Sequence, residues 1–190
     1  MNSRFWMIGL LLIMAVLCST ALTVVNIKTA PIIEYNSMIA RMGMVLDVFA
    51  IPYDRNNSDT VITAYNTAVE EREEKGLPLF IDRETGGRAV SFTGAGFQGP
   101  ISVIVALDND TIAGFKVVDQ KETPGLGARI TEEEFQRSFI GKQVAGGITM
   151  TKSGNSGVSE FDAITGATET SRALEKILNR GFAAYFTPQN

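Results

Sequence analysis

The feature that most constrains this chain is a run of 21 residues without a charged side chain, from Phe5 to Val25. An α-helix rises about 1.5 Å per residue, so a helix over this run is long enough to cross a hydrocarbon core of about 30 Å. We therefore expect residues 1–28 to form a single-pass membrane anchor. The remainder is long enough to bury one hydrophobic core outside the bilayer.

A cleaved signal peptide is the alternative interpretation of this run. The apolar part of a signal peptide usually covers about 7–15 residues and ends at small residues, for which Ser19-Thr20-Ala21 could serve. The apolar run continues from Leu22 to Val25, however, which favours a retained helix. Arg4 precedes the run and favours a C-terminal domain outside the cytoplasm, at the inner (plasma) membrane, although Lys28 and Arg41 weaken this signal.

Two helical segments are expected between the anchor and the remainder, within residues 29–76. In the first, apolar residues recur at helical spacing until Pro52 stops the pattern. They are Met38, Met42, Val45 and Phe49. In the second, Asn56 to Asp59 supply N-cap side chains, and an apolar stripe lies opposite a run of glutamates. This pattern predicts a helix that ends near Gly76, with the glutamates between positions 70 and 74 on its solvated face.

Short β-prone runs separated by turn residues follow, and residues 77–190 are expected to form one compact domain. Ile101–Leu107 and Thr111–Val118 flank a turn of aspartate and asparagine, which predicts a β-hairpin. An apolar face from Ala173 to Tyr185 predicts a C-terminal amphipathic helix. Because strands and helices do not alternate regularly, the predicted class is α+β, with a mainly antiparallel sheet flanked by helices.

The composition excludes several kinds of chemistry. The chain has no histidine and a single cysteine, Cys18, so a His-ligated metal site, a His-based triad, a thiolate cluster and an internal disulfide are all ruled out. A formal net charge of -4 gives no basic surface for a nucleic acid. No metal ligands and no catalytic side chains are predicted, so chemistry here needs a bound cofactor.

The segment Phe161–Ser171 gathers hydroxyl side chains around the start of the C-terminal helix. The first N–H groups of a helix lack partners within it and the helix dipole is positive there, so this place favours an anion and above all a phosphate. Gly166 and Ala167 would leave the approach open. A helix capped by a Thr or Ser side chain is the alternative that the residues alone leave open, and Glu169 in the first turn fits it equally well.

Asp162-Ala163-Ile164-Thr165-Gly166-Ala167-Thr168 closely resembles the flavinylation motif of the FMN-binding domain family. That family is found in the G subunit of the Rnf complex and in the C subunit of the sodium-pumping NADH:quinone reductase. Its last motif threonine holds the phosphate of FMN through a phosphoester bond, so the resemblance implies covalent FMN on Thr168. It also places the neighbouring motif residues in the cofactor site: Asp162, Thr165, Gly166 and Ala167.

Two upstream segments strengthen the resemblance. Glu122–Gly127 is similar to the loop that lies beside the flavin in the family, and Gly96–Ile101 enters a strand at the matching place in the order. From the first of these loops the resemblance implies further cofactor contacts: Glu122, Thr123, Gly125, Leu126 and Gly127. Rnf subunits often have a histidine just before this loop, whereas this chain has Gln120-Lys121. Lys121 could place a positive charge near the flavin or could simply be solvated.

The resemblance implies a membrane-anchored, Rnf-like electron carrier that relays electrons within an ion-translocating oxidoreductase complex, rather than a complete enzyme alone. The implied partners are the other membrane subunits and a Mg-dependent FAD:protein FMN transferase that attaches the cofactor. Three alternatives stay open: the C subunit of a quinone reductase, a stand-alone extracytoplasmic flavin reductase and a flavin-free module. The short chain favours the Rnf-like protein over the quinone-reductase one. For the flavin reductase, Lys121 and Arg129 are the cationic candidates that could bind an electron acceptor.

Overall fold

The first element of the chain is one long helix. The computed structural model describes residues 2–152, 154 and 156–187. Helix α1 (Asn2–Val48) contains the whole charge-free run and continues through Pro31, so the predicted anchor and the helix after it are one continuous element. Within the described residues, Phe5–Val48 is the one helix long and apolar enough to cross a membrane. Contacts divide the chain into two units, residues 1–40 and residues 41–190.

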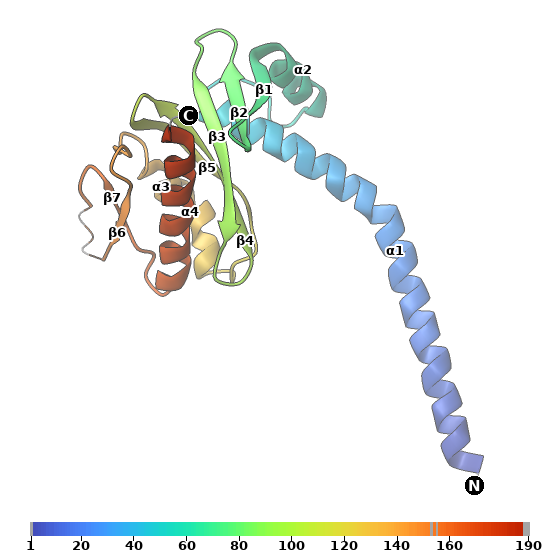
Figure 1. Cartoon of the computed structure of the whole chain (residues 1–190). Helices are drawn as coiled ribbons and strands as arrows, with labels where there is room; N and C mark the ends of the chain where they lie inside the picture. The colour runs from blue at the N-terminus through green and yellow to red at the C-terminus, as the bar shows by residue number, and fades with distance from the viewer. Residues whose placement is uncertain (1, 153, 155, 188–190) are drawn as a thin grey trace. The chain divides into compact units, whose positions relative to one another are not determined.

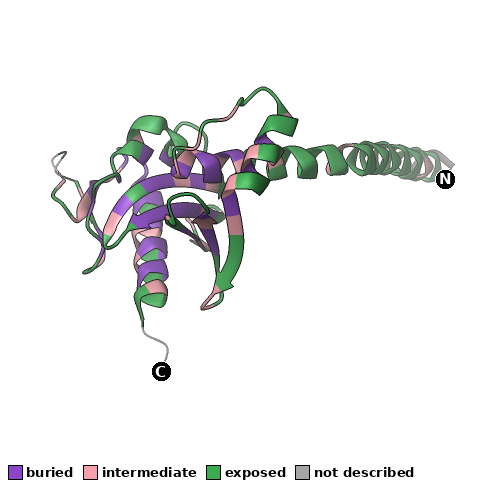
Figure 2. Cartoon of the chain, turned by 90° about the horizontal axis from the view of Figure 1, so that it is seen from above, coloured by how far each residue is buried: buried purple, intermediate pink, exposed green. Residues whose placement is uncertain are grey.

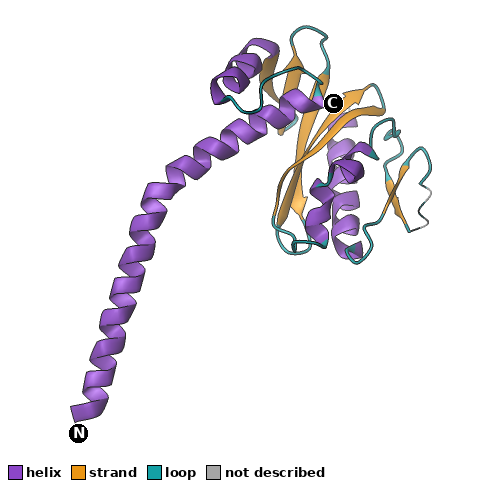
Figure 3. Ribbon diagram, turned by 180° about the vertical axis from the view of Figure 1, so that it is seen from behind, coloured by secondary structure: helices purple, strands orange, loops and turns teal. Residues whose placement is uncertain are grey.

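The second unit is built on a five-stranded sheet in which each strand pairs antiparallel with the next along the chain (Figure 3). The strands are β1 (Val69–Glu74), β2 (Leu77–Asp82), β3 (Arg88–Ala95), β4 (Pro100–Asp108) and β5 (Thr111–Gln120). The predicted hairpin is the β4–β5 pair, and Asn109 in its turn has φ 53°. The predicted α+β class with a mainly antiparallel sheet is confirmed.

The helix predicted to end near Gly76 is shorter than expected. Helix α2 (Ser58–Ala68) begins after Asn57, whose Oδ1 accepts from the Asp59 N–H at 3.0 Å, and it stops at Ala68. The next six residues form β1, which pairs with β2. The prediction of a helix over residues 69–76 is therefore wrong. Pairing of this segment with β2 outweighs its helical propensity, and that pairing cannot be seen in the local sequence pattern. The glutamates lie along an exposed edge strand, where charge discourages further strand pairing.

Helices and small elements cover one face of this sheet (Figure 1). They are the 3-10 helix η1 (Gly127–Thr131), helix α3 (Glu133–Arg137), the parallel pair β6 (Thr149–Thr151) and β7 (Glu160–Asp162), and helix α4 (Thr168–Phe186). Helix α4 packs on β3 and turns Leu174, Ile177 and Leu178 into the core, as the predicted amphipathic pattern requires (Figure 2). Phe182 meets Phe92 of the sheet edge to face, with ring centroids 5.3 Å apart.

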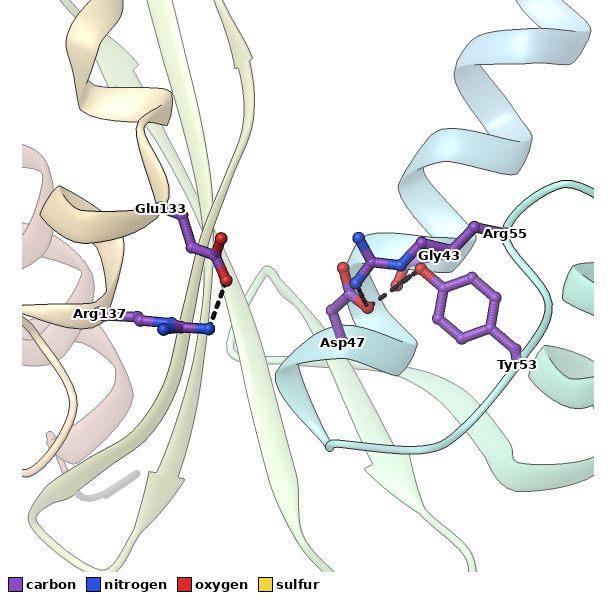
Figure 4. A network of polar contacts seen from close by, with 6 residues as sticks. All are labelled: Gly43, Asp47, Tyr53, Arg55, Glu133 and Arg137. Carbon is purple, nitrogen blue, oxygen red and sulfur yellow. Dashed lines mark hydrogen bonds and ion pairs between the residues drawn. The ribbon is translucent and has the colours of Figure 1, made fainter.

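The last turns of α1 are part of the second unit. Val45 and Leu46 are fully buried in it. The Tyr53 hydroxyl lies 3.0 Å from Asp47 Oδ1 and 3.1 Å from the Gly43 carbonyl, and Arg55 forms an ion pair with the same carboxylate at 2.7 Å (Figure 4). Burial, together with the Asp47 charge, raises the pKa of Tyr53 to about 12. The division into an anchor, a linking segment and a cofactor domain at residues 28 and 76 stays a prediction about function.

Candidate functional site

The start of α4 is held from inside the helix rather than by a capping side chain. The N-cap residue, Ala167, offers no side-chain hydrogen bond. Instead the buried Ser171 hydroxyl accepts from the Ile164 N–H at 3.0 Å and lies 3.1 Å from the Ala167 carbonyl, to which it donates. Gly166, at φ 83°, adopts a backbone conformation that favours glycine and lets the chain turn into the helix. Ser171 thus fixes the loop and leaves the helix entrance clear.

The helix entrance presents unsatisfied hydrogen-bond donors. Among the described residues, no acceptor bonds the backbone N–H groups of Thr168, Glu169 and Thr170. The half-buried Thr168 side chain likewise has no hydrogen-bond partner in the described part of the chain. The capped-helix alternative would need a Thr or Ser oxygen on these N–H groups, and none is found there. Free N–H groups and the positive end of a 19-residue helix favour a phosphate at this place.

Thr168 lines a cavity of about 370 Å³ to which three distant segments contribute, a size within the usual range of small-ligand sites. The segments are the Gly96–Gly99 turn, the loop after β5 and the start of α4. Of the predicted site residues, seven line the cavity: Glu122, Thr123, Leu126, Gly127, Gly166, Ala167 and Thr168. Three predicted residues are not among its lining residues: Asp162, Thr165 and Gly125. That these residues bind FMN stays a prediction.

Glu122 joins the three segments. The residue is only 4 % exposed, and its carboxylate accepts from the Phe97 and Gln98 N–H groups at 2.8 and 3.0 Å and from the Thr170 hydroxyl at 2.7 Å. These three hydrogen bonds tie the turn to the first turn of α4. With its oxygens taken by protein donors, Glu122 is placed to shape the cavity.

Gly127 shows how closely the segments approach. A Cβ atom there would lie 2.5 Å from Thr170 Oγ1 and 2.8 Å from Glu122 Oε2, which is too close for any side chain. The glycine of the predicted loop is therefore required by the contact between Glu122 and α4 rather than by turn geometry alone. The glycine could be recognised in the sequence, but the close approach of the Glu122 and Thr170 side chains to it could not.

Phe97 is a lining residue that the sequence analysis did not single out. Phe97 is 61 % exposed, and Leu126, also on the cavity, is 46 % exposed. Large apolar side chains exposed at a cavity are available to pack on an aromatic ligand. A signal was present, since Phe97 lies within one of the segments that resemble the family, but its exposure could not be deduced. A free hydroxyl, free N–H groups and apolar walls together fit a phosphorylated, aromatic cofactor such as FMN.

Asp162 and Arg129 occupy other positions. Asp162 ends β7, and its Oδ1 is buried without a hydrogen-bond partner among the described residues, which is unfavourable and uncommon in folded proteins. Arg129 bonds Glu132 at 3.0 and 3.2 Å, and this hydrogen bond and charge raise the pKa of Arg129. Neither Arg129 nor Lys121 lines the cavity, so the two cations considered for binding an electron acceptor are not directed at it.

Comparisons with known proteins agree with this chemistry. The chain matches the FMN-binding domain family over residues 96–183. It is 33% identical over 149 residues to the G subunit of the ion-translocating oxidoreductase complex of Vibrio atlanticus, covering 74% of this chain and 70% of that protein. It is 41% identical over 95 residues to the protein of the same name from Methanosarcina acetivorans, covering 49% of this chain and 48% of the other. The chain therefore spans about half the length of that archaeal relative.

A solved structure shares the fold. It is the C subunit of the Na(+)-translocating NADH-quinone reductase from Parabacteroides distasonis, with a TM-score of 0.68 and 25% identity. The similarity covers 83% of this chain and 96% of that one. The match therefore extends well beyond the short motif around Thr168.

Proposed function

We propose a function from one premise: this chain belongs to the family formed by the G subunits of ion-translocating oxidoreductase complexes. It is a membrane-anchored FMN-binding protein that relays electrons within such a complex, whose other membrane subunits are its partners. We further propose that its FMN is covalent, joined by a phosphoester to Thr168. When bound, FMN supplies the one- and two-electron chemistry that no side chain of this protein can perform.

The observation that carries the covalent link is the state of Thr168. Its hydroxyl lines the cavity without a hydrogen-bond partner among the described residues and stands at the N–H-rich start of α4. In attachment from FAD, Thr168 Oγ1 forms a bond to the FMN-side phosphorus, the bond between the two phosphates breaks, and AMP leaves. The hydroxyl proton passes to a base of the transferase. The positive helix start then faces the phosphodiester charge.

The remaining site residues have separate roles in this proposal. Phe97 and Leu126 pack on the aromatic ring, while Thr123 and Gly125 shape the loop beside it. Glu122 and Gly127 hold this loop against α4. The other members of the motif, Asp162, Thr165, Gly166 and Ala167, form the stretch that an FAD:protein FMN transferase recognises.

The location of the domain is a further part of the proposal. We place the C-terminal domain outside the cytoplasm at the inner (plasma) membrane, because Arg4 precedes the apolar run and such residues concentrate on the cytoplasmic side. A tethered cofactor suits this location, where free FMN would not be replenished. Residues 1–28 would then anchor, residues 29–76 connect and residues 77–190 hold the flavin, with β1 and the end of α1 supporting the same sheet.

A stand-alone flavin reductase is less well supported, since Arg129 is paired and neither proposed cation faces the cavity. The related C subunit of the quinone reductase has the same fold, but the family membership is with the G subunits.

Intact mass of the denatured full chain, co-expressed with a flavin transferase, tests the covalent link. The wild type and Thr168→Ser, which keeps a hydroxyl, should gain the mass of one FMN less one water, whereas Thr168→Ala should gain none. If the wild type stays unmodified while the same transferase modifies a control substrate, the proposed covalent link is wrong.

A further inference from the structure

A second cavity opens directly beside the Thr168 cavity. Its volume is about 490 Å³, and it lies between the end of β3 and the exposed side of α4. Phe97 and Glu169 line both cavities, so the two form one continuous depression. Any group that binds in the second cavity therefore lies next to the proposed flavin.

One wall of this second cavity is basic. Arg172, Lys176 and Arg180 line it from α4 at intervals of four residues, which places them in a row about 12 Å long. Arg172 is paired with Glu169, but no carboxylate among the described residues pairs with Lys176 or Arg180. Glu175 directly precedes Lys176 in sequence, yet its Oε1 accepts from the Met150 N–H at 3.2 Å, and Glu175 does not line the cavity.

The opposite wall adds no negative charge. The lining residues of β3 and the turn after it are apolar or small, including Gly94, Ala95 and Phe97. The cavity is thus a local positive groove in a chain whose net charge is -4. Lys176 and Arg180 are exposed and have no carboxylate partner among the described residues, so they act on what approaches from outside rather than on the fold.

We infer that this groove docks an acidic segment of the protein that exchanges electrons with the flavin. The inference rests on the proposed function and names the chemistry of its partner. A row of about 12 Å is longer than one small anion and matches several carboxylates of an extended chain. Apolar side chains of the partner that lie between its carboxylates can pack on the apolar wall. Complementary charge speeds association and fixes the register of the two chains. Docking here would bring the partner to the edge of the flavin site.

The test compares two double variants with the same change in charge. Lys176→Glu with Arg180→Glu reverses the groove, whereas Arg88→Glu with Arg137→Glu reverses exposed cations that do not line it. Each full chain is first loaded with FMN, and its intact mass is measured. Loading reports on the proposed covalent link and should be equal in all three proteins. A failure of loading in the wild type would count against the proposed function and not against the groove.

Loaded chains are then mixed with membranes that carry the remaining subunits in the reduced state, and the rate of flavin reduction is followed by absorbance. We expect the wild-type rate to fall as salt rises from about 0.05 to 0.5 M. The groove variant should be roughly tenfold slower at low salt and should lose most of this salt dependence. The control pair should behave as the wild type.

Three outcomes would overturn the inference. In the first, the groove variant keeps the wild-type rate and salt dependence. In the second, its flavin midpoint potential shifts while the salt dependence is unchanged, which would mean that the row acts on the flavin itself. In the third, the groove variant loses binding to vesicles of anionic phospholipid while the rate with the partner membranes is unaltered, which would assign the groove to lipid.

Discussion

Two regions of the domain use glutamate in opposite ways. Glu122, beside the start of α4, is buried and accepts from three donors that belong to distant segments. The glutamates of β1 lie exposed or half-exposed along the edge of the sheet, where Glu70 pairs with Arg72 at 2.7 Å and the pKa of Glu70 is lowered by that hydrogen bond. The fold around Glu122 depends on the exact position of its carboxylate oxygens, whereas at the edge of β1 only the negative charge of the glutamates matters.

The largest difference between the two regions is expected when Glu122 is replaced by alanine. This change leaves two backbone N–H groups and the Thr170 hydroxyl without their acceptor, so we expect a loss of about 3 kcal/mol in the free energy of unfolding. FMN loading should fall with it. Glu73→Ala in β1 is the matched control and should cost less than about 0.5 kcal/mol. Denaturant unfolding of the full chain in detergent measures both, and equal losses would contradict the distinction.

The next largest effect is expected at Gly127. In Gly127→Ala the new methyl group would meet Thr170 Oγ1 at 2.5 Å, so the loop and α4 must separate. We expect a loss of about 2 kcal/mol. Gly146→Ala, where a methyl group meets nothing within 4 Å, should be close to neutral. Thermal unfolding of the two variants measures both effects. A Gly127→Ala variant as stable as the wild type would show that the loop at Gly127 does not lie tightly against Thr170.

Phe97→Ala separates binding from folding. Because Phe97 is 61 % exposed, loss of its ring should change the free energy of unfolding by less than about 0.5 kcal/mol. The environment of the loaded flavin should change instead, seen as a shift in its absorbance and a stronger quenching of its fluorescence by iodide. Val158→Ala, at another exposed apolar residue, should leave both signals as in the wild type. Unaltered flavin signals in Phe97→Ala would show that the Phe97 ring does not contact the flavin.

The smallest effect concerns pH at the end of α1. The pKa of Tyr53 is about 12 in the folded chain and about 10 when unfolded. The contribution of this group is therefore complete below pH 10 and is lost as pH rises from 10 toward 12. Tyr53→Phe should flatten this part of the stability profile without removing it, because burial also raises the pKa of Tyr65. Tyr35→Phe serves as control, and an identical profile in Tyr53→Phe would contradict this assignment.

The sequence predicted the features that local chemistry determines. The charge-free run, the β4–β5 hairpin and the helix that begins at Thr168 each depend on neighbours within a few residues. β1 was misassigned because its identity depends on pairing with β2, while its first residue, Val69, continues the apolar stripe of the preceding helix and its glutamates suit a solvated helix face. The Glu122–Thr170 contact joins residues 48 positions apart, and the Phe97 N–H reaches the same carboxylate from 25 positions away. Both therefore required the folded chain.

The most direct test of the central claim is to locate the FMN on the loaded wild-type chain. Proteolysis after Lys152 and Arg172 releases residues 153–172, which contain Thr165, Thr168, Thr170 and Ser171 among their hydroxyls. Fragmentation of the modified peptide by mass spectrometry assigns the phosphoester to one of them. We predict that every modified peptide carries it on Thr168, and a phosphoester on any other residue, or none at all, would contradict the account.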